Sequence, residues 1–159
     1  MAWKRVGRPA SQRRTVVLYL FAVMLTCVSV SAKDKPKREI PCKTPANVAS
    51  CYWTHGRLSI YNGTPSYRLW KIGTHRLLGI YSGPAVYAGP LASRYPLDNE
   101  SPEFPANLTQ EAWKGMSASQ IWPVVYADFE VCPLEPEKPG VMQAACIESA
   151  KNLFVEKDK

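Results

Sequence analysis

Histidine is scarce in this chain, with only His55 and His75 among 159 residues. Neither lies in a G-x-S-x-G or cysteine-protease-like context, and the sequence holds no H-E-x-x-H segment and no glycine-rich phosphate loop. Nucleophilic catalysis needs a serine, cysteine or threonine beside a base, and metal hydrolysis needs a cluster of ligands. The sequence therefore favours a protein without enzymatic activity, and it predicts neither a cofactor nor a metal site.

A small hydrolase is the alternative function. Asp128 and Glu130 alternate with apolar residues and should share one face of a strand, where either carboxylate would act with His55 or His75. This alternative requires a histidine and a carboxylate within hydrogen-bond reach inside a cleft. Alternating charges on a strand are more often a solvated face, so the hydrolase ranks second.

Long hydrophobic runs are also lacking. The apolar run at residues 16–28 is shorter than the roughly 20 residues that a membrane-spanning helix needs. Basic residues precede the run, and residues 30–32 (VSA) suit a cleavage site. We therefore predict a signal peptide over residues 1–32, export to the periplasm or beyond, and no membrane span in the mature form. A retained anchor, a lipoprotein site at Cys27 and twin-arginine export fit less well.

Excess charge of one sign is small once residues 1–32 are set aside. The formal net charge of +7 comes from 20 basic and 13 acidic residues, and residues 1–32 hold five of the basic residues and no acidic one. A nearly balanced chain lacks the basic stripe that nucleic-acid binding rewards. Nucleic acid is therefore not an expected partner, whereas an envelope glycan or an envelope protein is.

Removal of the signal peptide leaves Cys42, Cys51, Cys132 and Cys146. Their spacing does not suit zinc, which prefers close pairs. An even number of cysteines in an exported chain indicates two disulfides.

Alternating apolar residues and turn signals predict five strands and one short helix. The strands are expected over residues 51–61, 67–72, 75–81, 124–134 and 141–147, and the helix over 108–116. Asn107 and Gln110 resemble a pair that caps this helix, and Gly79 suggests a bulge. Residues 153–155 either extend the last strand or form another, and residues 82–104 are expected to be a surface loop with no core role.

This order of elements favours a mainly β fold, a small OB-like closed or partly open barrel of five strands with one short helix between the third and fourth. The first strand would then lie antiparallel to the fourth, which brings Cys51 near Cys132 and leaves Cys42 for Cys146. Pairing of Cys132 with Cys146 stays possible through a bulge, although the final hairpin is expected to place them out of register. The predicted organisation is a flexible leader over 33–50, one β-rich domain over 51–155 and a tail over 156–159.

The best candidate binding surface is the outward face of the first strands. Its aromatic and basic residues are Trp53, His55, Arg57, Tyr61, Arg68, Trp70, His75 and Arg76. Aromatic rings beside arginines stack on sugars or bases and hold anionic groups, as barrel faces of this class often do. The structural alternative is that Trp70 packs in the core, Tyr61 covers the barrel end and the arginines are only solvated.

A series of motifs resembles a group of exported bacterial proteins to which no activity is assigned. The series is HGRL at 55–58, YNGTP at 61–65, R-L-W at 68–70 and GT-H-R-L-LG at 73–79, followed by DFEVCP at 128–133 and PGVMQ at 139–143. The resemblance covers most of residues 51–155. It implies bacterial export and nothing about chemistry.

Overall fold

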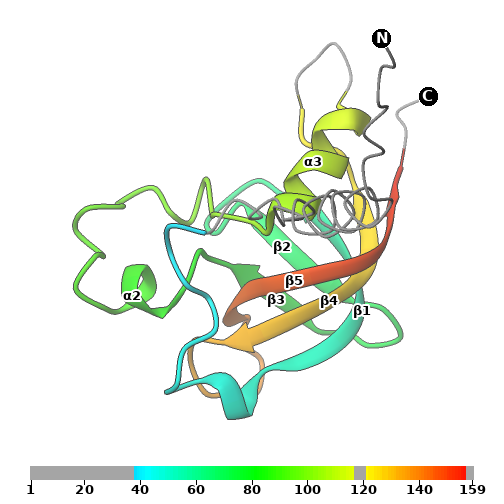
Figure 1. The fold of residues 1–159 in the computed structure, drawn as a ribbon. Helices are drawn as coiled ribbons and strands as arrows, with labels where there is room; N and C mark the ends of the chain where they lie inside the picture. The colour runs from blue at the N-terminus through cyan, green and yellow to red at the C-terminus, as the bar shows by residue number, and fades with distance from the viewer. Residues whose placement is uncertain (1–37, 117–120, 157–159) are drawn as a thin grey trace, which may run out of the picture. The chain divides into compact units, whose positions relative to one another are not determined.

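The structure is a computed structural model that describes residues 38–116 and 121–156 (Figure 1). The predicted signal peptide (1–32), residues 33–37 of the predicted leader and residues 157–159 of the predicted tail lie outside the described residues. No helix within the described ranges is long and apolar enough to cross a bilayer.

Five strands form a closed barrel (Figure 1). The strands are β1 Tyr52–Ile60, β2 Tyr67–Lys71, β3 Leu77–Ile80, β4 Val125–Pro133 and β5 Gln143–Val155. Their order around the barrel is β1-β2-β3-β5-β4, and β4 closes the barrel by pairing with β1. β3 and β5 run parallel, while all other neighbours are antiparallel. The prediction of a mainly β, five-stranded barrel with one short helix before the fourth strand is confirmed.

Side chains that alternate along the strands fill the barrel. The four inward-facing residues of β4 are fully buried, as the period-two pattern predicted: Val125, Ala127, Phe129 and Val131. The other strands complete the core with Leu58, Leu69, Leu78, Ile80 and Ile147. Because successive side chains of a strand point to opposite faces, the residues between these core positions lie on the outer surface of the barrel.

The helix α3 (Ala106–Gly115) closes one end of the barrel by burying Leu108 and Ala112, four residues apart on one face. No side chain caps this helix, so the prediction that Asn107 caps it is wrong. The Asn107 amide instead donates a hydrogen bond to the carbonyl oxygen of Ala150 in β5, 2.6 Å away. A tertiary contact has taken the place of the local one.

Residues 82–104 contribute to the core, so the prediction of a surface loop without a core role is wrong. Phe104 joins the barrel core, and Val86 is buried in a short helix, α2 (Pro84–Tyr87). The buried carboxylate of Asp98 accepts hydrogen bonds from the backbone N–H of Ser82, 3.0 Å away, and from its hydroxyl. Side-chain bonds of this kind leave no periodic pattern in the sequence.

Residues 38–50, which we call the N-terminal strap and which belong to the predicted leader, lie against the barrel. The Arg38 guanidinium donates hydrogen bonds to the carbonyl oxygens of Ser82 (2.7 Å), Glu103 (2.8 Å) and Ile147. Ile40 is 4% exposed, and a single 3-10 turn, η1 (Val48–Ser50), leads into β1. The strap has little apolar surface of its own, so its order depends on these long-range contacts.

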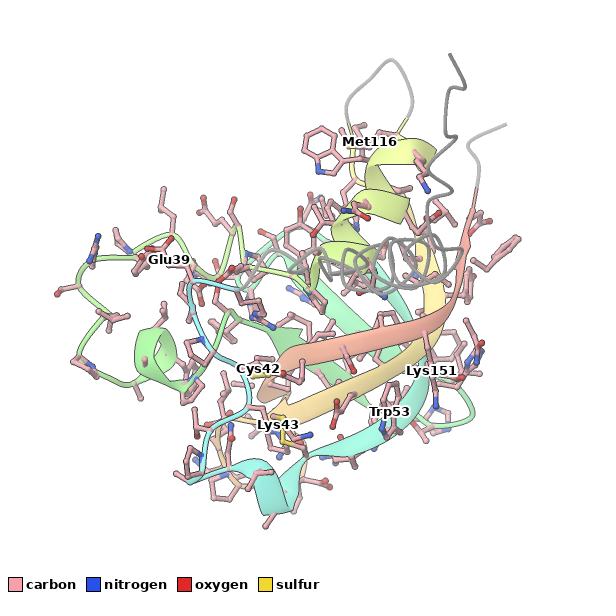
Figure 2. All side chains as sticks on the ribbon, viewed as in Figure 1. Glu39, Cys42, Lys43, Trp53, Met116 and Lys151 are labelled. Carbon is pink, nitrogen blue, oxygen red and sulfur yellow. A yellow bond between two sulfur atoms is a disulfide. The ribbon has the colours of Figure 1, made fainter. Side chains whose placement is uncertain are left out.

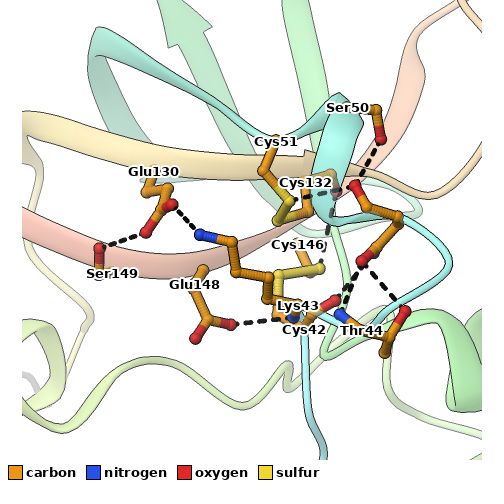
Figure 3. Close-up of polar contacts among 11 residues, drawn as sticks. Cys42, Lys43, Thr44, Ser50, Cys51, Glu130, Cys132, Cys146, Glu148 and Ser149 are labelled. Carbon is orange, nitrogen blue, oxygen red and sulfur yellow. Dashed lines mark hydrogen bonds and ion pairs between the residues drawn. A yellow bond between two sulfur atoms is a disulfide. The ribbon is translucent and has the colours of Figure 1, made fainter.

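Two disulfides join the strap and Cys51, the residue before β1, to the final strands (Figure 3). They link Cys42 to Cys146 and Cys51 to Cys132, the pairs that strand order favoured. The expectation about the final hairpin is wrong, because Cys132 and Cys146 are direct cross-strand neighbours. Each of these two cysteines nevertheless bonds to a partner nearer the N-terminus.

The last strand differs from prediction in its length and in the position of its irregularities. β5 runs without a break through residues 153–155, so these residues extend the strand. Register shifts occur in the pairing of β4 with β5, whereas Gly79 pairs regularly with both of its neighbours. Gly79 is needed for a close approach, since a Cβ there would lie 2.6 Å from the Pro65 ring.

Candidate functional site

The strand register assembles a row of large side chains on the outside of the barrel. Arg57 in β1 lies opposite Trp70 in β2 on one side and Tyr126 in β4 on the other. Tyr126 in turn lies opposite Phe154 in β5, with ring centroids 6.2 Å apart. Trp70 is 40% exposed and Phe154 is 64% exposed. The row therefore presents three aromatic rings and one guanidinium to solvent, and Trp70 is not a core residue.

A fourth aromatic ring lies nearer the start of β1. Trp53 is 46% exposed, and the Nζ atom of Lys151 in β5 lies 4.1 Å from its ring centroid (Figure 2). Between Trp53 and the row lie His55 and, opposite it in β4, Asp128. We call the surface made by Trp53, His55, Arg57, Trp70, Tyr126, Asp128, Lys151 and Phe154 the outer face.

Arg68 shapes the turn between β1 and β2 and is therefore not available as a free cation. Its guanidinium donates hydrogen bonds to the carbonyl oxygens of Pro65 (3.1 Å) and Asn62 (3.2 Å). It also lies 5.4 Å from the ring centroid of Tyr61, whose hydroxyl accepts a hydrogen bond of 3.0 Å from Arg57. Tyr61 and Arg68 thus border the outer face, and Arg68 holds its loop in place.

Trp70 has a fixed orientation on the outer face. Its indole N–H donates to the carbonyl oxygen of Thr74, 2.7 Å away in the β2–β3 turn. The bond restrains the ring while leaving it partly exposed, so little rotamer entropy would be lost on stacking against a ligand.

His75 and Arg76 lie in the turn between β2 and β3. Arg76 forms an ion pair of 2.6 Å with Glu137 in the β4–β5 loop. His75 and Arg76 both line a small hollow of about 260 Å³, together with Gly140 and Met142. In the part of the chain that the structure describes, His75 makes no hydrogen bond to a carboxylate.

His55 and Asp128 form the one histidine–carboxylate pair among the described residues. The His55 Nδ1 atom lies 3.0 Å from the Asp128 carboxylate, whose other oxygen accepts a hydrogen bond of 2.6 Å from the Asn152 amide. The hydrogen bonds from Asn152 and then from His55 lower the pKa of Asp128. The side chains are 56% and 32% exposed, and the pair lies on open sheet surface. The distance that a hydrolase needs is present, but neither residue lines the hollow beside α3 or the one beside His75.

Glu130 belongs to the attachment of the strap (Figure 3). Its carboxylate forms an ion pair with Lys43 and accepts a hydrogen bond of 3.0 Å from the Ser149 hydroxyl. The hydrogen bond from Lys43 lowers the pKa of Glu130, and that from Ser149 adds to the effect. This role is structural, and Glu130 has no histidine partner among the described side chains.

Sequence reasoning missed Tyr126, Lys151 and Phe154 on the outer face. Tyr126 stands between two buried residues of β4, so the period-two pattern that placed its neighbours in the core could have found it. The same pattern could not have found Phe154, because a register shift separates this residue from the regular part of β5. An apolar hollow of about 680 Å³ beside α3 was missed as well.

No protein-family model, curated protein or solved structure matches this chain. Within residues 38–116 and 121–156, no three histidine, cysteine or acidic side chains gather as metal ligands would.

Proposed function

We propose that the chain is an exported, non-enzymatic binding domain whose outer face holds an acidic, sugar-containing polymer of the bacterial envelope. The observation that carries this proposal is the cross-strand row in which Arg57 stands between Trp70 and Tyr126. An arginine between an exposed ring, Trp70, and a half-buried ring, Tyr126, can bind an anionic group with the donors that Tyr61 does not use, while the rings stack on neighbouring sugars.

The charge balance of the outer face supports an anionic ligand. Asp128 is engaged by His55 and Asn152, and Glu130 at the border of the face is engaged by Lys43 and Ser149. An incoming carboxylate or phosphate would meet Arg57 and Lys151. The carboxylates of Asp128 and Glu130 already have partners within the protein. This arrangement favours acidic over neutral polymers.

The barrel topology supports an OB-like assignment. β1 closes on β4, β3 and β5 run parallel, and α3 lies between the third and fourth strands at one barrel end. OB-fold barrels bind oligomers on the face of strands 2 and 3 and at loops that include the β1–β2 loop, and Trp70 of β2 belongs to the outer face. The loop that Arg68 holds in place has this position, and the motif resemblance to exported bacterial proteins agrees with an envelope ligand.

Affinity electrophoresis of the mature protein through gels containing an acidic polysaccharide tests the proposal. Arg57→Ala and Trp70→Ala should each weaken retardation by about five-fold, which corresponds to roughly 1 kcal/mol. The matched controls are Arg94→Ala, an exposed arginine on the loop after α2, and Trp113→Ala, an exposed tryptophan on α3. Arg68→Ala is unsuitable because it releases the β1–β2 turn.

Two outcomes would contradict the proposal. One is wild-type retardation of Arg57→Ala and Trp70→Ala, with unchanged melting temperatures. The other is hydrolysis of the polysaccharide that disappears in His55→Ala, which would favour the hydrolase alternative.

A further inference from the structure

The helix α3 carries a second row of side chains that the core does not use. Leu108 and Ala112 face the barrel and are fully buried. Thr109, Trp113 and Met116, at spacings of four and three residues, lie on an adjacent face of the helix. Trp113 is 63% exposed, and Met116 lies at the end of α3 (Figure 2). Burial of the helix against the barrel does not explain these large apolar side chains.

This second row forms one wall of the hollow of about 680 Å³, which we call the α3 hollow. Its floor is a cluster of three aromatic rings, Tyr67, Phe104 and Trp122, with centroids 5.1 to 5.5 Å apart. Ile60 and Ile121 lie at its edge, and Ile121 is 62% exposed. The volume falls within the range of about 300–1,000 Å³ that is typical of sites for small molecules.

The polar groups of the α3 hollow restrict its ligand. Glu103 lines the hollow, but its two carboxylate oxygens accept hydrogen bonds from the backbone N–H groups of Glu39 (2.8 Å) and Ile40 (2.7 Å). It is therefore already satisfied and is a poor partner for a cation. No described residue accepts a hydrogen bond from the Tyr67 hydroxyl, and burial raises its pKa, so it remains a donor at neutral pH. The Trp122 indole N–H also lacks an acceptor among the described atoms, but it is buried and does not face the hollow's solvent space.

We propose that the α3 hollow binds a single acyl chain whose carbonyl end accepts a hydrogen bond from the Tyr67 hydroxyl. Aromatic and aliphatic walls suit the hydrocarbon, and an unused hydroxyl donor near a carboxylate that is already hydrogen-bonded suits an acid or ester group. The concave shape favours a small molecule over a second copy of the chain, which would present a broader surface. A free fatty acid and a single-chain ester share this chemistry. The site is separate from the outer face and does not depend on the proposed function.

Quenching of tryptophan fluorescence by 12-bromododecanoate tests this proposal directly. The exported protein with Trp53→Phe and Trp70→Phe retains Trp113 and Trp122 as the reporters of the described barrel. Quenching should be saturable and reversed by unlabelled dodecanoate. Affinity should rise from octanoate to dodecanoate, because each added methylene leaves water. Competition by monododecanoylglycerol shows whether an ester is accepted as well as an acid.

A matched pair of charge substitutions locates the site. Ile121→Glu should weaken binding by about ten-fold, since it places a carboxylate beside the hydrocarbon. Val141→Glu is the control: Val141 is 54% exposed in the β4–β5 loop and should tolerate the same change. Equal affinity of both variants would overturn the proposal, and so would the absence of saturable quenching. Wild-type dimerisation that Ile121→Glu abolishes, without any binding of dodecanoate, would instead assign the hollow to a second copy.

Discussion

The carboxylates of β4 show how side chains from other elements occupy the hydrogen-bonding groups of single residues. Asp128 and Glu130 each accept hydrogen bonds from side chains of other elements, and these bonds lower the pKa of both groups. The alternation of β4 predicted that both carboxylates lie on the outside of one strand. It could not predict Asn152 or Lys43 as partners, because the β5 register and the docked strap bring them near.

Substitution of Glu130 by glutamine should flatten the acid side of the stability profile. The folded-state pKa of Glu130 is lowered, chiefly by the Lys43 hydrogen bond. Its stabilising contribution is therefore present above the unfolded-state pKa, near 4.3, and is lost as pH falls through the lower folded-state pKa. Thermal scans between about pH 6 and pH 2 should show a smaller loss of Tm for Glu130→Gln than for the wild type.

The control for this measurement is Glu100→Gln, a change on the exposed loop before α3. It should reproduce the wild-type acid profile. If the profiles of wild type and Glu130→Gln run parallel down to the acid limit, the Lys43 contact contributes no pH-dependent stability.

At the scale of elements, strands were predicted well and the connections between them poorly. β1 and β4 matched their predicted ranges closely, because their apolar and polar residues alternate. Residues 82–104 did not, since Phe104 and Val86 reach the core as isolated anchors without a period. Only part of the outer face was predicted from the sequence. Apolar and polar residues alternate in β1 and β2, which revealed their outward side chains, whereas the end of β5 does not alternate.

Substitutions in the buried row and in the second row of α3 should differ in their effects on the free energy of unfolding. Leu108→Ala removes a fully buried side chain and should lower the free energy of unfolding by about 2–4 kcal/mol. Trp113→Ala on the neighbouring row should change it by less than about 0.5 kcal/mol, because its side chain is mostly exposed. Urea unfolding followed by circular dichroism measures both values. A large loss for Trp113→Ala would mean that the second row is structural.

At the scale of the whole molecule, three long-range connections hold the chain together. β4 pairs with β1 to close the barrel, and the two disulfides bridge residues 81 and 104 positions apart. Bridges across such long loops contribute roughly 3–4 kcal/mol each by constraining the unfolded chain. The order of elements was enough to predict the closure and favour this pairing. It was not enough to predict that the strap contacts the barrel, because the hydrogen bonds of Arg38 reach three distant segments.

The central claim is that the chain is exported and that two disulfides crosslink its barrel, and peptide mapping of the protein recovered from its producing cells tests it most directly. Mass spectrometry without reduction should find an N-terminus at Lys33, with Cys42 joined to Cys146 and Cys51 joined to Cys132. Residues 1–32 still attached to a chain with four free thiols in its β-domain and strap would contradict the account.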